Sequence, residues 1–186
     1  MLARLFARLL PGRGRDRRPA FDAFSSLVAQ ARHPVFFHGW GVPDTIDGRF
    51  DMVALHVFLL MHRLKGQGAE AEAFSQAVFE VMVADMDHSL RELGAGDTGV
   101  GKRVKRMVRG MAGRIQAYDR ALAADGNAAL EAALDNNVYG TVPDSDPVAV
   151  AALAGYVRDQ AAHLATQDVG ALVAARFTLA PPPVRG

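Results

Sequence analysis

Apolar residues recur every three or four positions over most of this chain, which is the period of an amphipathic α-helix. Glycine, proline and aspartate separate the periodic segments, and no alternating strand pattern is longer than three or four residues. We therefore predict an all-α fold, a single compact helical domain of about six to seven helices around a buried central hairpin. The expected helices cover residues 20–32, 48–65, 69–93, 98–124, 128–136, 147–166 and 168–177.

The three helices between residues 48 and 118 carry most of the information. The first is almost wholly apolar over residues 52–61. A helix that crosses a membrane needs about 20 apolar residues, twice this length, so the run favours a helix of the core. Only His56 interrupts the run, and we predict a core histidine whose ring N–H is paired with Asp85 or Glu92 of the next helix.

Charge is distributed unevenly over these helices, although the whole chain has a formal net charge of only +1. Residues 70–97 carry seven acidic side chains against one arginine, and residues 102–120 carry seven basic side chains against one aspartate. The basic helix also has an apolar stripe that predicts its buried face. Its other face predicts a partner-binding surface made of Lys102, Lys105, Arg106, Arg109, Gly113 and Arg114.

Gly113 is the unusual member of that surface. A glycine inside a helix costs up to about 1 kcal/mol relative to alanine, and this one points away from the apolar stripe. Our hypothesis is that another helix or chain approaches closely there, between Arg109 and Arg114. The alternative is a solvated basic face with incidental glycines.

Asp85, His88 and Glu92 share one face of the acidic helix, because they are three and four residues apart. Carboxylates and an imidazole at this spacing are metal ligands in helical bundles, but those bundles use two such motifs and this chain has one. We therefore predict no metal site. We predict instead a structural ion-pair cluster formed by Arg49, His56, Asp85, His88 and Glu92.

The N-terminus has a short amphipathic pattern followed by a basic linker. Leu2, Leu5, Phe6 and Leu9 share one face of the expected helix, and Arg4 and Arg8 lie on the other. This pattern predicts an interfacial helix that contacts a membrane through these residues. The alternatives are a mitochondrial-type presequence and a solvated terminus. The expected organisation is residues 1–19 as the basic segment and linker, 20–177 as the helical domain and 178–186 as a flexible tail.

Motifs for catalysis are missing from the sequence. The chain has no cysteine, which excludes disulfides, thiolate catalysis and cysteine-ligated metals. It also has no glycine-rich phosphate loop, no nucleophile elbow and no zinc-binding spacing. We predict a protein that is not an enzyme and that uses no cofactor.

Three blocks of sequence, over residues 36–56, 75–97 and 104–118, carry a resemblance to a known family. The first contains Val42-Pro-Asp-Thr-Ile-Asp-Gly-Arg-Phe-Asp, the second Asp85-Met-Asp-His-Ser-Leu-Arg-Glu-Leu-Gly-Ala-Gly-Asp and the third Gly113-Arg-Ile-Gln-Ala-Tyr. In order and spacing they resemble the ubiquinol–cytochrome c chaperone family, the assembly factors of the respiratory ubiquinol–cytochrome c reductase (complex III). The composition, rich in alanine, arginine and glycine, suits a bacterial member.

The resemblance implies a helical, non-catalytic assembly chaperone that binds the newly made cytochrome b subunit or other complex III assembly components. It implies a place in the bacterial cytoplasm, peripherally on the inner face of the cytoplasmic membrane, or alternatively on the matrix side of the mitochondrial inner membrane. The competing interpretation is a ribosome- or RNA-associated protein that uses the basic helix over residues 98–120.

Overall fold

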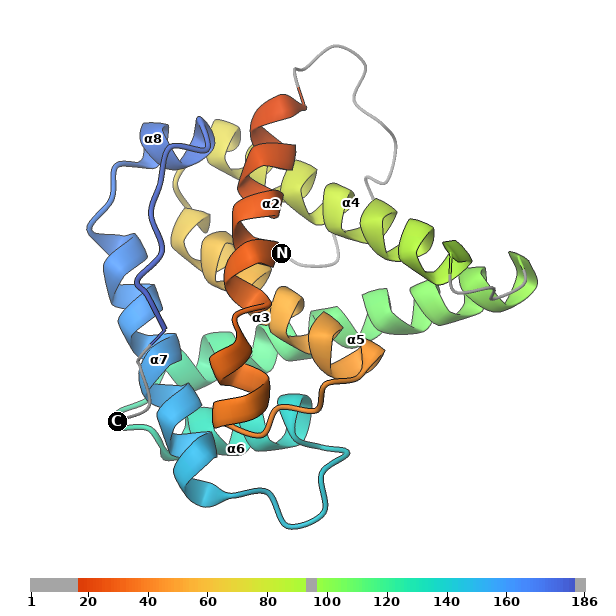
Figure 1. Ribbon diagram of the computed structural model, residues 1–186. Helices are drawn as coiled ribbons and strands as arrows, with labels where there is room; N and C mark the ends of the chain where they lie inside the picture. Colours follow the sequence, from red (N-terminus) through yellow and green to blue (C-terminus); the bar gives the residue numbers. More distant parts are fainter. Residues whose placement is uncertain (1–16, 93–96, 183–186) are drawn as a thin grey trace.

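The computed structural model describes residues 17–92 and 97–182, with residues 97–105 described by their backbone alone. Over these ranges the chain forms seven α-helices and one π-helical turn, with no strand (Figure 1). The predicted all-α fold is therefore confirmed. The elements are α2 (Arg18–Ala31), η1 (Val35–Gly39), α3 (Ile46–Leu64), α4 (Ala69–Glu92), α5 (Asp97–Ala123), α6 (Ala128–Val138), α7 (Pro147–Ala165) and α8 (Val169–Val173).

Helix α3 lies at the centre of the molecule. Every residue over positions 54–60 is buried, and the helix contacts α2, α4, α5, α6 and α7. A helix that is apolar on all sides has no face for water, so this sequence requires neighbours around it. Thr45 begins the helix, because its side chain accepts a hydrogen bond from the Gly48 N–H at 3.1 Å.

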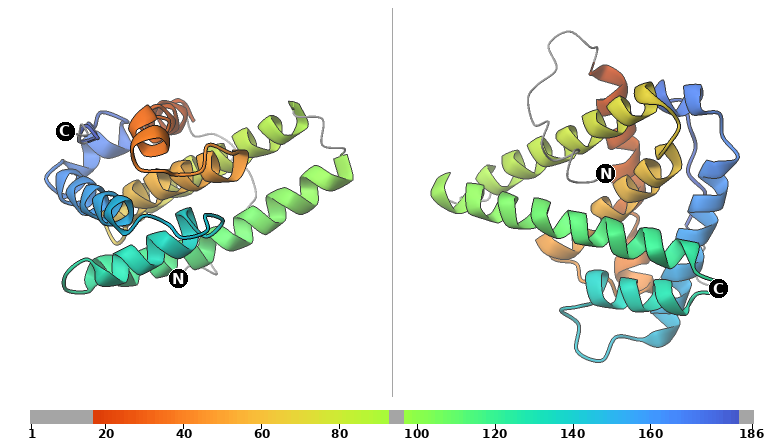
Figure 2. Two further views of the ribbon diagram at one scale, coloured as in Figure 1. Left: turned by 60° about the horizontal axis from the view of Figure 1, so that its bottom comes forward. Right: turned by 180° about the vertical axis from the view of Figure 1, so that it is seen from behind.

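Helices α4 and α5 form a pair whose far ends project beyond the other helices (Figure 2). We call this projecting pair the arm. Its far part has a small apolar cluster of its own, made of Met86 and Leu90 on α4 and Met107 on α5. Phe50 of α3 packs against that cluster, together with Val108. The arm is therefore an extension of the core and is joined to α3 near the start of that helix.

Helix α7 runs beside α3 in the same direction. Near its middle Tyr156 contacts His56, and about two turns further on the Leu164 carbonyl accepts a hydrogen bond from Arg63 at 3.0 Å. Asp146 caps α7 by accepting from the Val148 N–H at 2.9 Å, with Pro147 at the first helical position. The chain thus returns to its central helix after about a hundred residues.

Two boundaries of the predicted domain differ from the structure. Helix α2 begins at Arg18, not at residue 20, with Pro19 in its first turn. The start of the expected flexible tail is bound to α7 and to the turn after it, because the N–H groups of Thr178 and Ala180 donate to the side chains of Gln167 and Gln160 at 2.9 and 3.1 Å. These side-chain amides satisfy backbone groups of the extended segment, a pairing that hydrophobic periodicity does not reveal.

The predicted membrane-contact segment, with Leu2, Arg4, Leu5, Phe6, Arg8 and Leu9, lies outside the described residues. Among the described helices, none combines the length and the apolar character that a membrane span requires.

Candidate functional site

A histidine–tyrosine pair lies in the contact between α3 and α7. His56 is fully buried, and its Nε2 accepts a hydrogen bond from the Tyr156 hydroxyl at 2.8 Å. Its Nδ1–H donates to the Met52 carbonyl, also at 2.8 Å. Burial lowers the pKa of His56 to about 4, so the ring is neutral. His56 is a core histidine, but its predicted partners, Asp85 and Glu92, were wrong.

Side chains from two further segments surround this pair. The Gln30 amide on α2 donates to the Tyr156 hydroxyl at 3.0 Å and to the Ala180 carbonyl at 2.8 Å. The rings of Phe36 and Trp40 meet the Tyr156 ring edge-on, with centroids 5.1 and 6.0 Å away. The aromatic segment that contains Phe36 and Trp40 thus closes the core over the histidine.

The predicted ion-pair cluster does not form. Asp85, His88 and Glu92 are exposed on α4, where His88 Nε2 lies 3.2 Å from the Glu92 carboxylate. Arg49 pairs with the exposed carboxylate of Asp44 at 2.6 Å. The reason is geometric, because His56 faces α7 while the three α4 side chains point into solvent. Within the described part of the chain, no three histidine or acidic side chains converge in a way that would hold a metal ion.

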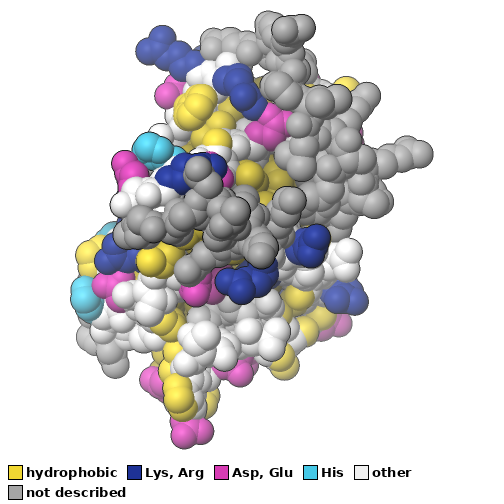
Figure 3. All heavy atoms as spheres, turned by 90° about the vertical axis from the view of Figure 1, so that its right-hand side faces the viewer, with side chains coloured by type: hydrophobic (Ala, Val, Ile, Leu, Met, Phe, Trp, Pro, Cys, Tyr) yellow, Lys and Arg dark blue, Asp and Glu magenta, His cyan; other side chains and the backbone are white. Residues whose placement is uncertain are grey.

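The basic side of α5 is only partly as predicted. Arg106, Arg109 and Gly113 are exposed, and a Cβ at Gly113 would meet no atom within 4 Å. No described part of the chain therefore fills the space beside Gly113. The side chains of Lys102 and Lys105 lie outside the described residues. On the face seen in Figure 3, the described Lys and Arg side chains stand among acidic and apolar ones and do not gather into one patch.

Arg114, predicted to contact a partner, contacts α3 of its own chain. Its guanidinium lies 2.7 Å from the Asp51 carboxylate and 5.8 Å from the centre of the Phe50 ring. Burial raises the pKa of the Asp51 carboxyl to about 7; the charge of Arg114 opposes this rise and that of Asp47 adds to it. Arg114 thus anchors the arm to α3, and we remove it from the partner-binding surface.

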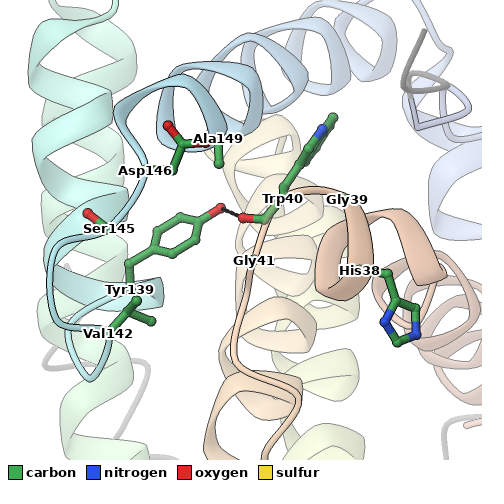
Figure 4. Close-up of a pocket in the computed structure, with 9 residues that line it drawn as sticks. All are labelled: His38, Gly39, Trp40, Gly41, Tyr139, Val142, Ser145, Asp146 and Ala149. Carbon is green, nitrogen blue, oxygen red and sulfur yellow. Dashed lines mark hydrogen bonds between the residues drawn. The ribbon is translucent and has the colours of Figure 1, made fainter.

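A second feature of the surface is a pocket of about 310 Å³ between η1 and the loop that joins α6 to α7. Residues 38–41 form one side, and the other side is formed by Tyr139, Val142, Ser145, Asp146 and Ala149 (Figure 4). The Tyr139 ring crosses between the two sides, and its hydroxyl donates to the Trp40 carbonyl at 2.9 Å. The ring of Tyr139 is buried, so it closes the base of the pocket.

This pocket, which we call the acidic pocket, was not predicted from the sequence. A signal was nevertheless present, because residues 121–157 contain five acidic side chains and no lysine or arginine. Three of the five, Asp135, Asp144 and Asp146, lie at the end of α6 and in the following loop. Helical periodicity describes buried faces and gives little information about such loops.

The class of protein that the fold defines is a compact all-α protein with a buried central helix and a projecting two-helix arm. The chain belongs to the ubiquinol–cytochrome C chaperone family, whose sequence model matches residues 38–179. The family predicted from the three sequence blocks is therefore confirmed.

Relatives and a solved structure agree with this assignment. Ubiquinol-cytochrome-c reductase complex assembly factor 1 of Xenopus laevis is 26% identical over 149 residues, which cover 80% of this chain and 74% of that protein. The proteins of the same name from Mus musculus and Homo sapiens are 26% identical over 145 residues, and the match spans 48% of their length. The crystal structure of the Cbp3 homolog from Brucella abortus superposes with a TM-score of 0.79 at 36% identity, covering 97% of both chains.

Proposed function

We propose that this chain assists the assembly of ubiquinol–cytochrome c reductase by binding the newly made cytochrome b subunit, without catalysing a reaction. The observation that carries the proposal is the agreement of the whole fold with the Cbp3 homolog, together with relatives named as assembly factors of this reductase. Because the match spans only about half of the mouse and human relatives, the proposal concerns the helical domain that they share with this chain.

The exposed basic side of α5, with Arg106, Arg109 and Gly113, is the surface we propose for a partner protein. Two properties support it. Gly113 leaves open space where a partner backbone can approach, and the two arginines beside it offer planar donors to carboxylates or backbone carbonyls. The α5 helix also reaches the projecting end of the molecule, where a large partner meets little obstruction (Figure 2).

For location we propose the inner face of the bacterial cytoplasmic membrane, with the contact made by Leu2, Arg4, Leu5, Phe6, Arg8 and Leu9. Their apolar and basic pattern supports this proposal. Sedimentation with vesicles that contain anionic lipids should then require residues 1–18 and weaken with salt. Binding that survives their removal would contradict the proposed contact.

The decisive experiment is affinity purification of the full chain from solubilised membranes, followed by identification of the bound proteins. We expect cytochrome b with the wild type and less of it with Gly113→Leu, because a leucine there fills the space proposed for the partner. Ala129→Leu, on the exposed side of α6, is the matched control and should retain the subunit. Deleting the gene should lower assembled reductase without lowering its transcripts, and a normal level of complex would refute the function.

A ribosome- or RNA-associated role remains the second candidate, because Arg106 and Arg109 are exposed on one helix. It predicts that ribosomal RNA, not cytochrome b, co-purifies with the chain and dissociates steeply as salt rises. The same purification therefore separates the two functions.

A further inference from the structure

The acidic pocket combines an aromatic base with negative charge. Burial raises the pKa of the Tyr139 hydroxyl, and the charges of Asp146 and Asp135 raise it further, so both carboxylates lie near this ring. Asp146 lines the pocket directly, and Asp135 accepts a hydrogen bond from the hydroxyl of Ser145, another lining residue. The carboxylates are thus held in place around the opening.

On the side of the pocket formed by α6, α7 and the loop between them, the charge of the Lys, Arg, Asp and Glu side chains is of one sign. Residues 121–157 contain no lysine or arginine, so the acidic side chains at this end of α6 and α7 have no basic neighbour within their own segment. Val148, between the lining residues Asp146 and Ala149 in sequence, is 75% exposed. A carboxylate that lines the pocket and an exposed apolar side chain therefore lie within two residues of each other at the start of α7.

We propose that the acidic pocket binds a lysine or arginine side chain from an extended cytoplasmic loop of the membrane protein that this chain helps to assemble. The inference rests on the proposed function, which places a membrane-protein client at the cytoplasmic face. Loops on that face are enriched in lysine and arginine, so the client carries the charge that complements this surface.

The shape of the pocket suits such a side chain. The alkyl stem of a lysine or arginine packs on aromatic rings while its charged head remains near carboxylates and water. Here the stem lies along the Tyr139 ring, and the head reaches Asp146. The neighbouring residues of the client loop then pass over Val148. This surface is opposite in charge to the basic side of α5, so the two recognise different parts of a partner.

Peptide binding tests the proposal directly. The probes are synthetic peptides that cover the cytoplasmic loops of the cytochrome b subunit from the same organism, and the same peptides with every lysine and arginine replaced by glutamine. The Trp40 ring is buried against Phe36 and Tyr156, so binding is measured by isothermal titration calorimetry and not by tryptophan fluorescence. We expect at least one basic peptide to bind and its glutamine counterpart not to bind.

Three isosteric substitutions remove the charge without altering the fold. They are Asp135→Asn, Asp144→Asn and Asp146→Asn. An asparagine at position 146 can still cap α7, and one at position 144 tolerates the positive φ of 51° there. The combined variant should bind the basic peptide about tenfold more weakly or worse. The matched control makes the same change of net charge at exposed positions elsewhere, by Asp22→Asn, Asp125→Asn and Asp159→Asn together. This control should bind the peptide like wild type.

Equal weakening in the two variants would mean that net charge alone attracts the peptide, and the proposal would be wrong. It would also be wrong if calorimetry detected no binding of any basic peptide. If the pocket variant instead abolished self-association in sedimentation equilibrium, the occupant would be a second copy of this chain.

The client experiment separates this inference from the proposed function. If wild type and the pocket variant both retain cytochrome b equally from solubilised membranes, the function stands and the pocket proposal fails. If neither retains it while basic peptides still bind in a manner that depends on the three aspartates, the pocket proposal stands and the client is another membrane protein.

Discussion

The Tyr156 hydroxyl donates to Nε2 of His56 across 2.8 Å, and both side chains are almost completely removed from solvent. One residue lies on the central helix and the other on the helix that follows a hundred positions later. The bond therefore joins two helices, α3 and α7, that are far apart in the sequence. The Met52 carbonyl can accept only from a protonated Nδ1, so in the neutral ring Nε2 is the nitrogen that accepts from the tyrosine.

The neutral state of His56 predicts a dependence of stability on pH. Its pKa is about 4 in the fold and ordinarily 6.5, so between these values the unfolded chain binds a proton that the fold excludes. The stabilisation linked to this neutral histidine is fully present above pH 6.5. It is lost as the pH falls to 4, which lowers the free energy of unfolding by roughly 3 kcal/mol.

Asp51 acts in the opposite direction over the same range. Burial raises its pKa from 3.8 to about 7, so its contribution is present below pH 3.8 and is lost as pH rises to about 7. We expect the free energy of unfolding, measured with urea between pH 4.5 and 8, to change little with pH for the wild type. For Asp51→Asn it should fall steeply as the pH is lowered. Adding His56→Leu should lower stability at every pH and remove the slope. A level profile for Asp51→Asn would contradict the assignment to His56.

Two tyrosines differ in how their hydroxyls are satisfied. The hydroxyl of Tyr156 has partners on α2 and α3, whereas that of Tyr118 is buried and has no hydrogen-bond partner among the described residues. Tyr156→Phe should therefore lower the free energy of unfolding by about 1–3 kcal/mol, because it leaves the imidazole Nε2 without its donor. Tyr118→Phe should be neutral or stabilising by up to about 1 kcal/mol. Chemical denaturation measures both, and equal losses would contradict the difference.

Arg158 of α7 closes the carboxyl end of α5. Its guanidinium donates to Asn127 Oδ1 at 2.6 Å and to the carbonyls of Ala121, Leu122 and Ala124 at 3.1–3.3 Å. Arg158→Met should destabilise the fold by about 2–3 kcal/mol, since it leaves several helix-end carbonyls unpaired. Arg158→Lys should recover little of this, because an ammonium lacks the planar fork of donors. The exposed Arg176→Met is the control and should change thermal stability by less than about 0.5 kcal/mol.

Two helical glycines predict opposite effects of the same substitution. A Cβ at Gly113 meets nothing within 4 Å, so Gly113→Ala should stabilise the fold by about 0.5–1 kcal/mol through helix propensity. A Cβ at Gly48 would lie 2.0 Å from the Pro43 carbonyl oxygen, so Gly48→Ala must displace the chain before α3. We expect a loss of about 2 kcal/mol or more there. Destabilisation by Gly113→Ala would show that another group occupies that space.

Periodicity predicted the helices well because it reports which face of each segment is apolar. It placed His56 in the core for the same reason. It did not identify what covers that face, and the partner of His56 is Tyr156, on a helix that the sequence gives no local reason to choose. Proximity along the chain favoured Asp85 and Glu92 on the adjacent helix, but these remain in solvent.

The candidate site was predictable only in part for a related reason. A basic residue beside an apolar stripe can either remain in water or turn towards an acid on a neighbouring helix. Arg106 and Arg109 do the first, whereas Arg114 turns to Asp51. The difference depends on where α3 crosses α5, which is a property of the assembled fold. The acidic pocket escaped prediction because its two sides are a hundred residues apart.

The late arrival of α7 at the central helix has a consequence during synthesis of the chain itself. The ribosome releases His56 and its apolar neighbours about a hundred residues before Tyr156, an interval of roughly 5–20 seconds at about 5–20 residues per second. Throughout that interval one side of α3 has no covering helix. A protein proposed to shelter an unfinished membrane subunit therefore passes through a vulnerable nascent stage of its own, which general holding chaperones would be expected to protect.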